Sequence, residues 1–590
     1  MEVKGSFLAA FFVLTWSSFI WADQSQLLFD EPEGASSSGI RVAVIGAGAA
    51  GSSAAYHLQK FSQAGPDPIP LDITIFDTST RVGGRTTTVN ALDDPKYPTE
   101  LGGSIFVQIN HILYNFTREF GFNATSKIFR SSPGSKYDLG IWDGSEFVLI
   151  QANDDGRSRW QGWWDLVKLL WKYGLSPITT QRLTKNAVGK FLRFYDEPLF
   201  PFSTLQAAVE ETDLLQYVGA TGEQVLQTAG VSELFSREVI QASTRVNYGQ
   251  NLGGIHGLEA LVCMAIEGAI AVEGGNWQLF DEAVKRSHAT VKLNNTVTEV
   301  VKSDKGGYHI HTSTDQVGEE RSYDTVILAA PYQFANITFT PPLTHPPETI
   351  PYVSLHVTLL TSPHRLSPSF FDLDSEDEVP SSVLTTLPKD LDLGSRRGID
   401  AVGPPGFWSI STLRVLDPDS DGAIDHDDTA SPSPSETESS QRPQYQGHQP
   451  QYLYKIFSPA PLTAAFISRL LDFPLAAEDA STDADTDTSL SAISKSDVTW
   501  FYQKIWKSYP YETPRTVFER IRLDGDPTSD LAEDSTGDLS GSLKQVQGNG
   551  IWYTSGIESF ISTMETSALS GMNVARLIVD ELRSRNNGTS

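Results

Sequence analysis

Three glycines near the start of the chain are spaced as in loops that bind dinucleotides. Gly46, Gly48 and Gly51 follow the pattern G-x-G-x-x-G. In that pattern the first glycine turns the chain, the second lets backbone N–H groups approach a pyrophosphate, and the third packs a helix against a strand. The β-branched run Arg41–Ile45 predicts a buried parallel strand, and Ser52–Lys60 predicts the helix that follows. The predicted cofactor contacts of this loop are Gly46, Gly48, Ala49, Ala50 and Gly51.

A second predicted strand, Ile73–Phe76, ends at Asp77, whose carboxylate could accept hydrogen bonds from a ribose. The interval from Gly51 to Asp77 is longer than the usual spacing of about 20 residues. The turn-rich run Gly65–Pro70 explains the difference as an inserted loop. Strand, helix, strand and acid in this order predict a dinucleotide site, and a glycine turn that binds nothing is the alternative.

A second glycine-rich run identifies which dinucleotide is expected. Arg81, Gly83, Gly84 and Arg85 form the run RVGGR directly after the acidic residue. Paired glycines allow close backbone approach, and arginine is a forked cation for phosphate. The run resembles the second phosphate loop of flavoproteins in the amine oxidase and desaturase group. We therefore predict FAD, bound noncovalently because the only cysteine, Cys263, lies far along the chain from these motifs; no metal site is predicted.

Composition and charge restrict the partners. The 590 residues carry a formal net charge of −29, which disfavours nucleic acid and anionic membrane surfaces. Much of the negative charge is in runs rich in serine, threonine and proline, as in residues 417–451, which we predict to be a disordered insert. No segment after residue 22 reaches the length and apolarity of a transmembrane helix.

The first 22 residues predict a signal peptide. Lys4 precedes an apolar stretch, Phe7–Trp21, and Ala22 is a plausible cleavage position. An uncleaved anchor is the alternative. Entry into the secretory pathway would make N-glycans plausible. The acceptor sequences begin at Asn115, Asn123, Asn294, Asn336 and Asn587.

The predicted fold class is α/β, with a discontinuous Rossmann-like FAD-binding domain and a mixed α+β substrate domain. Strand-like runs at Tyr323–Ala330 and Ile551–Thr554 recur far from the first glycine loop. Helical patterns at Trp163–Lys172 and Leu205–Gln216 fall between them. The predicted FAD-binding pieces are residues 39–111, 271–342 and 548–583, and the predicted substrate-domain pieces are 112–270 and 343–547.

The C-terminal piece resembles the closing flavin motif of the amine oxidase group. The resemblance rests on Gly556, Glu558, Met564 and Glu565. In that motif a helix N-terminus points free N–H groups at the flavin pyrimidine ring. Gly274–Leu279 is similar to the second segment of the group, in which the backbone of a valine, here Val297, contacts the adenine. Glycines that let the chain pass close to the flavin are expected in the run Gly102, Gly103 and Ser104.

Further segments narrow the resemblance. Arg245–Gln250 and Val272–Asn276 look like prenylcysteine oxidases, also called prenylcysteine lyases, as do Gly102–Ile105 and Gly556–Ala568. The resemblance implies a two-domain, amine oxidase-like architecture. It also implies an FAD-dependent thioether oxidase that converts S-farnesyl- or S-geranylgeranyl-cysteine, oxygen and water into cysteine, an isoprenal and hydrogen peroxide. The expected location is the secretory lumen, as in a vacuole or lysosome, with secretion as the alternative.

Catalytic side chains are predicted near the family-specific run. We expect Arg245, Asn247, Tyr248 and Gln250 to approach the flavin or the cysteine end of the substrate, with the guanidinium holding a carboxylate. His256 could act as an acid or base. The alternative is structural: Arg245 in an internal ion pair and His256 as an ordinary buried or surface histidine. Glu558 and Glu565 are expected to fix the helix and the cofactor rather than to move protons.

The sequence is also compatible with two other functions. One is an FAD-dependent oxidase or desaturase for amines or polyenes. Amine oxidases commonly have an aromatic residue just before the Met-Glu pair, where this chain has Thr563, which argues against an amine substrate. The other is a flavoprotein that binds isoprenoids without catalysis.

Overall fold

The computed structural model describes most of the chain. The described residues are 39–126, 136–153, 169–265, 268–314, 321–394, 396–416, 449–475, 489–524 and 550–588. The predictions for residues 1–22, most of 417–451 and most of Trp163–Lys172 lie outside them. Among the described residues, no helix is long and apolar enough to cross a bilayer.

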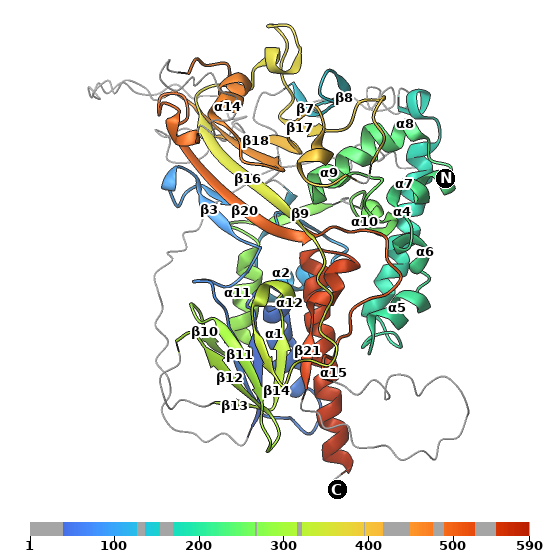
Figure 1. Ribbon diagram of the computed structural model, residues 1–590, viewed down its shortest axis with the longest axis vertical. Coiled ribbons are helices and arrows are strands. Elements are labelled where there is room, and N and C mark those ends of the chain that lie inside the picture. The colour runs from blue at the N-terminus through green and yellow to red at the C-terminus, as the bar shows by residue number, and fades with distance from the viewer. Residues whose placement is uncertain are drawn as a thin grey trace, which may run out of the picture.

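A five-stranded parallel sheet is built from three distant parts of the sequence (Figure 1). All four pairings are parallel, as the buried β-branched runs predict. The sheet confirms the predicted Rossmann-like fold class. Its strands in order are β10 (Thr290–Lys292), β2 (Leu71–Phe76), β1 (Ile40–Ile45), β14 (Thr325–Leu328) and β21 (Ile551–Tyr553).

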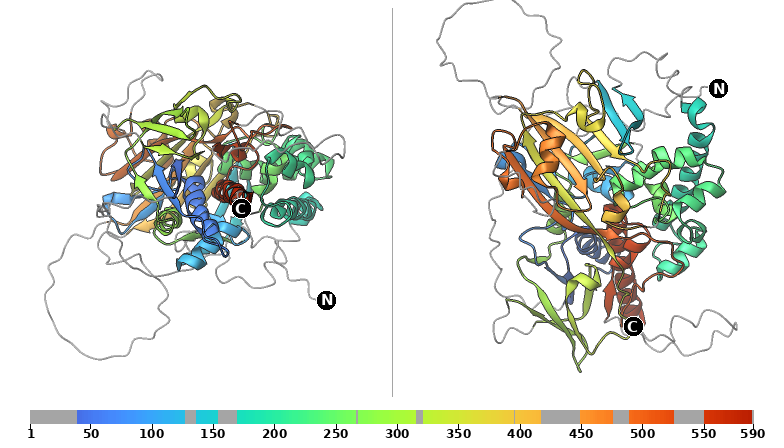
Figure 2. Two further views of the ribbon diagram at one scale, coloured as in Figure 1. Left: turned by 90° about the horizontal axis from the view of Figure 1, so that it is seen from below. Right: turned by 45° about the horizontal axis from the view of Figure 1, so that its top comes forward.

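Helices cover one face of this sheet. α1 (Ala49–Ser62) packs along α15 (Met564–Gly588), and Figure 2, left, shows the blue and dark red helices side by side. The contact is close because residue 571 is glycine: a Cβ there would lie 2.1 Å from the Ala50 carbonyl oxygen. α11 (Trp277–Arg286) and α2 (His111–Phe120) complete the layer. The predicted boundary between the FAD-binding piece 39–111 and the substrate-domain piece 112–270 assigns nearly all of α2 to the substrate domain. In the structure α2 packs on α11 and α15, which belong to the FAD-binding part.

A four-stranded sheet covers the other face. Its members are β13 (Ser322–Tyr323), β12 (Tyr308–Thr312), β11 (Val297–Lys302) and β15 (Thr338–Thr340). Val300 and Tyr308 pack there against Ala43 and Val326 of the parallel sheet. The parallel strands are therefore buried on both faces.

A seven-stranded mixed sheet forms the centre of the second domain, in the upper half of Figure 1. α14 (Ala464–Leu471) packs into the apolar cluster on one face. The strands in order are β20 (Trp500–Pro510), β16 (Tyr352–Ser362), β19 (Gln451–Ser458), β18 (Ser409–Leu416), β17 (Ser382–Thr385), β7 (Tyr137–Trp142) and β8 (Phe147–Ala152). This sheet confirms the predicted combination of a Rossmann-like part with a mixed second domain.

Short helices form a separate group on the right of Figure 1. The helical pattern predicted over Leu205–Gln216 forms two helices, α5 and α6, because Asp213 takes a left-handed φ of 56° between them. Its carboxylate is instead paired with Lys190. The group comprises α4 (Ser176–Leu192), α5 (Leu205–Glu211), α6 (Leu215–Val218), α7 (Gly222–Thr228), α8 (Glu233–Phe235), the π-helix η5 (Ser236–Ile240), α9 (Gln241–Tyr248) and α10 (Gly257–Val262).

Small elements link the two domains. They are β3 (Thr88–Asn90), β4 (Pro98–Glu100), β5 (Phe106–Val107), β6 (Ala124–Thr125), β9 (Ala269–Val272), α12 (Tyr332–Ala335), α13 (Ile399–Val402) and the 3-10 helix η8 (Ser555–Ser559). β9 pairs with both β5 and β6, so the chain between the glycine loops and the substrate domain is held by backbone hydrogen bonds.

Candidate active site

The first glycine loop connects β1 to α1 and has no room for side chains. Gly46 has a φ of +112°, which favours glycine. A Cβ on Gly51 would lie 1.8 Å from the Gly46 carbonyl oxygen. Gly48 faces Gly84 of the second glycine loop. A Cβ added to Gly84 would lie 3.1 Å from the Gly48 Cα. No side chain caps α1, which begins at Ala49 and Ala50, so its first N–H groups remain available to an anion.

Asp77 fixes this loop. Its Oδ2 accepts a hydrogen bond of 2.7 Å from the Ala47 N–H, and its Oδ1 accepts one of 2.7 Å from the Ser79 N–H. Each carboxylate oxygen keeps a second lone pair with which it could also accept a ribose hydroxyl. The Asn295 N–H donates to the Asp77 carbonyl oxygen, which brings the nearby Val297 to the same end of the sheet.

The second glycine loop lies against the first. The Gly83 N–H donates to the Ala47 carbonyl oxygen at 2.9 Å, and Gly83 and Gly84 have φ values of +112° and +57°. Burial lowers the pKa of Arg81, which Asp77 partly offsets. The two loops and the uncapped helix therefore form one cradle of backbone N–H groups and cations that fits a pyrophosphate.

Arg85 joins this cradle to the C-terminal piece. Its two terminal nitrogens lie 3.0 and 2.6 Å from the two carboxylate oxygens of Glu558. Nη1 also donates to the Ser508 carbonyl oxygen at 2.5 Å, and the Tyr352 hydroxyl donates to Glu558 at 3.1 Å. Burial acts to lower the pKa of Arg85, but the Glu558 carboxylate raises it above its ordinary value. The guanidinium thus remains charged.

The three FAD-binding pieces meet at the glycine pair Gly102 and Gly103, where the Asn276 amide of the second piece donates to the Gly103 carbonyl oxygen at 3.0 Å. A Cβ on Gly102 would lie 1.9 Å from the Arg85 carbonyl oxygen, and one on Gly103 would lie 2.5 Å from the Met564 sulfur. The Ser104 hydroxyl donates to the Gly102 carbonyl oxygen at 2.7 Å. Segments separated by more than 400 positions in the sequence are therefore in direct contact where the flavin ring is expected.

The closing segment, residues 556–568, is held from both sides. Glu565 is buried and accepts hydrogen bonds from the Ile112 and Leu113 N–H groups at 2.8 and 3.0 Å. The Tyr195 hydroxyl donates to it at 2.7 Å. Burial raises the pKa of Glu565, and these donors oppose that shift. Gly556 lies in η8, where a Cβ would lie 2.9 Å from the Cβ of Glu519.

Lys455 links the second domain to the glycine pair, and sequence analysis did not single it out. From β19 its Nζ donates to the Glu100 carbonyl oxygen at 2.7 Å and to the Ser104 hydroxyl at 3.0 Å. Burial lowers the pKa of Lys455 to about 8 and raises the pKa of the Glu100 carboxyl to about 7. A single lysine among apolar strand residues gives no signal of this role.

Part of the family-specific run reaches the closing segment. The Tyr248 hydroxyl donates to the Ser562 carbonyl oxygen at 3.2 Å. Gln250 binds the end of β20, accepting from the Glu512 N–H at 3.0 Å and donating to the Pro510 carbonyl oxygen at 3.4 Å. His256 caps α10, with Nδ1 accepting from the Glu259 N–H at 3.1 Å.

Arg245 and Asn247 donate side-chain hydrogen bonds to other groups of the protein. Arg245 is fully buried and donates to Thr385, Asn251 and the carbonyl oxygens of Ala401 and Val402. Burial lowers its pKa to about 9. Its donors are thus used to join α9 to β17 and α13, without the ion pair that the structural alternative supposed. The Asn247 amide donates back to the Ser243 carbonyl oxygen at 2.9 Å within α9.

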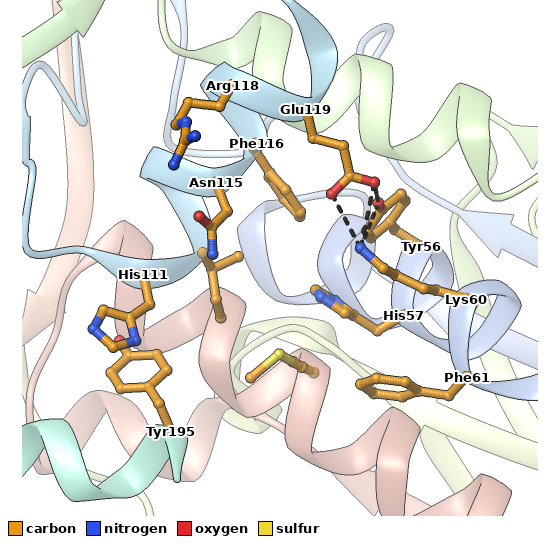
Figure 3. A pocket seen from close by; sticks show the side chains of 12 residues that line it. Tyr56, His57, Lys60, Phe61, His111, Asn115, Phe116, Arg118, Glu119 and Tyr195 are labelled. Carbon is orange, nitrogen blue, oxygen red and sulfur yellow. Dashed lines mark hydrogen bonds and ion pairs between the residues drawn. The ribbon is translucent and has the colours of Figure 1, made fainter. Parts of the chain in front are cut away.

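A separate groove of about 590 Å³ lies between the C-terminal half of α1, α2 and α15 (Figure 3). The ion pair between Lys60 and Glu119, 3.0 Å long, crosses one side, and Asn115 and His111 point into the other. None of the residues predicted to bind the cofactor or to catalyse lines this groove. It is therefore distinct from the cradle at the N-terminus of α1.

Comparison with known proteins agrees with the geometry. A family model described as prenylcysteine lyase matches residues 157–526 and 544–589, and a model of an NAD(P)-binding Rossmann-like domain matches residues 44–120. The chain belongs to the prenylcysteine lyase family. This confirms the predicted family. The match covers the second domain and the closing segment, where the substrate-specific residues of a two-domain oxidase are expected.

Individual relatives and a solved structure are similar to this chain to different extents. The chain is similar to farnesylcysteine lyase of Arabidopsis thaliana, with 26% identity over 92% of this chain and 89% of that protein. It is similar to human prenylcysteine oxidase 1, with 30% identity over 60% of this chain and 69% of that protein. Among solved structures, cyclohexylamine oxidase from Brevibacterium oxydans matches 92% of this chain with 14% identity and a TM-score of 0.48.

Proposed function

We propose that the protein is an FAD-dependent thioether oxidase. It cleaves S-prenyl-cysteine to cysteine and an isoprenal, and reduces oxygen to hydrogen peroxide. The observation that carries the proposal is the family match across the second domain and closing segment, because these parts would contact the substrate. The names of the relatives, farnesylcysteine lyase and prenylcysteine oxidase, support this substrate class.

The residues of the cradle fit FAD. The loops at Gly48 and Gly84 would hold the pyrophosphate, Asp77 the ribose, and the segments at Gly103 and Met564 the ring. FAD, when bound there, would accept a hydride from the carbon that joins the prenyl chain to sulfur. We propose noncovalent binding, because burial raises the pKa of the Cys263 thiol well above its ordinary value and so suppresses the reactive thiolate.

The protein's own side chains would orient the substrate and exclude water. The face of the seven-stranded sheet toward Leu101 is apolar, with Val353, Leu355 and Trp408 packed there in one cluster. An apolar wall beside the glycine pair suits an isoprenoid chain and strengthens electrostatic interactions in the site.

Product analysis tests the function. Purified protein incubated with S-farnesylcysteine and oxygen is expected to yield farnesal, cysteine and hydrogen peroxide in equal amounts. Amines and polyenes serve as the comparison set. Faster turnover of any amine than of S-farnesylcysteine would contradict the proposed substrate class.

We also propose that the chain is glycosylated in the secretory pathway, with a vacuole or lysosome as its destination. Four of the acceptor asparagines are exposed, which supports this proposal; they are Asn115, Asn123, Asn294 and Asn336. Digestion with peptide N-glycosidase F should lower the apparent mass of the native protein. An unchanged mass would contradict the proposal.

An acidic compartment is consistent with the buried carboxyl groups. Burial raises the pKa of Glu100 to about 7, so its contribution to stability is complete below its ordinary pKa and is lost as pH rises through about 7. Burial lowers the pKa of His57 to about 4, so its contribution is lost as pH falls from its ordinary pKa toward 4. Most of the Glu100 contribution is lost between pH 4.5 and 7, so over that range we expect the unfolding temperature of wild type, relative to Glu100→Gln, to fall by a few degrees, on the order of what about 1–2 kcal/mol produces. Calorimetry of wild type and Glu100→Gln checks this, and the variant should show a flatter profile.

A further inference from the structure

A group of buried polar side chains behind the closing segment has no assigned role. Glu512 follows β20, and Glu259 and His256 belong to α10. All three are at most 1% exposed. Tyr248 from α9 and Tyr509 from β20 meet edge to face, with ring centroids 4.9 Å apart. Burial raises the pKa of Tyr248, and the charges of Glu259 and Glu512 add to that shift.

Several polar atoms of this group have no hydrogen-bond partner within the described part of the protein. They include both carboxyl oxygens of Glu512, Nε2 of His256 and the hydroxyl of Tyr509. Because His256 Nδ1 accepts from the Glu259 N–H, Nε2 carries the proton of the neutral ring. Nε2 lies 3.6 Å from a Glu512 oxygen. Buried polar atoms without protein partners are costly, so these atoms either hold a proton or bind a small polar molecule such as water.

The pKa values of both carboxyl groups in this group are raised. Burial raises the pKa of Glu259 to about 8. Burial also raises the pKa of Glu512 well above its ordinary value, and the nearby Glu259 charge adds to the shift. Burial lowers the pKa of His256 to about 3, so the imidazole stays neutral and does not compensate the carboxylates. At neutral pH the two carboxyl groups therefore retain protons that they can donate.

The group is adjacent to the proposed flavin site. The Tyr248 hydroxyl contacts the Ser562 carbonyl oxygen, and Ser562 is two residues before Met564, which packs at Gly103. Glu558, the partner of Arg85, also adds to the raised pKa of Glu512. The polar group thus lies directly behind the closing segment, on the side of the second domain.

The proposed reaction has a step that needs such a group. FAD, when bound, would accept a hydride from the carbon attached to sulfur, and water would then add to that carbon. The carbon–sulfur bond then breaks, and its electron pair leaves with the sulfur. Of the two protons of the water, one must reach the sulfur to give the thiol, and the other is used in reducing oxygen to peroxide. A cysteine thiolate is a poor leaving group without a proton donor.

We infer that Glu259 and Glu512 form a proton-holding pair that supplies the proton for the departing cysteine sulfur through the hydroxyls of Tyr248 and Tyr509. This inference rests on the proposed function. In this assignment the pair acts through the tyrosines and does not touch the substrate. The carboxylate left after donation recovers its proton from the added water, so the pair is unchanged after each turnover.

Anaerobic single-turnover kinetics with S-farnesylcysteine test the inference. Flavin bleaching reports oxidation of the substrate, and quenched samples report free thiol. For Glu512→Gln and Glu259→Gln we expect bleaching within about twofold of wild type, but thiol release slower by at least about tenfold, as removal of an acid–base group usually gives. Glu238→Gln is the matched control, because Glu238 is a buried glutamate (2% exposed) that pairs with Lys172 and Tyr173. It should change neither rate.

The pH profile is a second readout. Thiol release by wild type should fall as pH rises through the pKa of the pair, whereas release by Glu512→Gln should be flatter. Infrared spectra of wild type should show a protonated carboxyl band that Glu512→Gln reduces. The titratable and charged groups that face the pair are Tyr248, His256, Cys263, Arg515 and Glu558, and Tyr509 packs against the Tyr248 ring.

The outcomes separate the two proposals. Equal rates of bleaching and thiol release in wild type and both glutamine variants would overturn the proton-holding pair alone. A wild-type flavin that does not bleach with S-farnesylcysteine would overturn the proposed function. If neither glutamine variant folds, Tyr509→Phe decides, because it removes a hydroxyl that has no partner in the described protein. Slower thiol release with normal bleaching would support the inference, and unchanged thiol release would contradict it.

Discussion

Gly51→Ala is expected to yield protein without FAD. The new methyl group would lie 1.8 Å from the Gly46 carbonyl oxygen, so the loop and the start of α1 must separate. Such an overlap with backbone cannot be relieved by rotating a side chain, and it displaces the N–H groups that face the pyrophosphate. We expect the affinity for FAD to fall by at least about 100-fold, which corresponds to about 2.7 kcal/mol.

The flavin content of purified protein, read from its absorbance, measures this effect. Gly189→Ala is the matched control. Gly189 lies within α4, and a Cβ there meets nothing within 4 Å. Alanine should stabilise that helix by roughly 0.5–1 kcal/mol and leave flavin content unchanged. Full flavin content in Gly51→Ala would show that the loop does not hold the cofactor.

Arg85→Met is expected to cause the second large effect. It leaves the Glu558 carboxylate, whose side chain is 4% exposed, without its cation. Because the Arg85 side chain is itself 37% exposed, the cost is expected to be about 1–3 kcal/mol, the typical cost of leaving a buried polar group without its partner. The same change removes a link between the second glycine loop and the closing segment. We therefore expect lower stability together with loss of flavin.

Thermal unfolding with and without added FAD measures both the loss of stability and the loss of flavin binding. Arg193→Met is the control, since Arg193 and Glu211 form an exposed pair worth about 0–1 kcal/mol. The double variant Arg85→Met/Glu558→Gln should recover part of the stability but none of the flavin affinity. Equal stability of Arg85→Met and wild type would mean that this ion pair does not hold the second glycine loop to the closing segment.

Local sequence patterns predict the cofactor half of the molecule well. The run from Arg41 to Asp77 contains its own strand, turn and helix signals, and each appears in the structure as β1, α1 and β2. The closing segment is also recognisable, because Met564 and Glu565 stand at the start of α15. Such signals depend on neighbours in sequence, which is why they can be read without the fold.

Contacts between distant residues could not be predicted. Arg85 and Glu558 are 473 positions apart, and neither the bidentate pair nor its bond to Ser508 leaves a local pattern. Glu512 lies in a polar stretch that suggests a surface loop, yet it is 1% exposed, because β20 carries it against α10. Arg245 shows the opposite problem: its position in a family-specific run suggested substrate contact, whereas the structure uses its donors between α9, β17 and α13.

Anaerobic titration of the purified full-length protein with S-farnesylcysteine tests the central proposal most directly. The protein should carry one FAD per chain, and its visible absorbance should bleach with one equivalent of substrate and return when oxygen is admitted. A colourless protein that takes up no FAD, or a yellow one that stays oxidised with excess S-farnesylcysteine, would contradict the account.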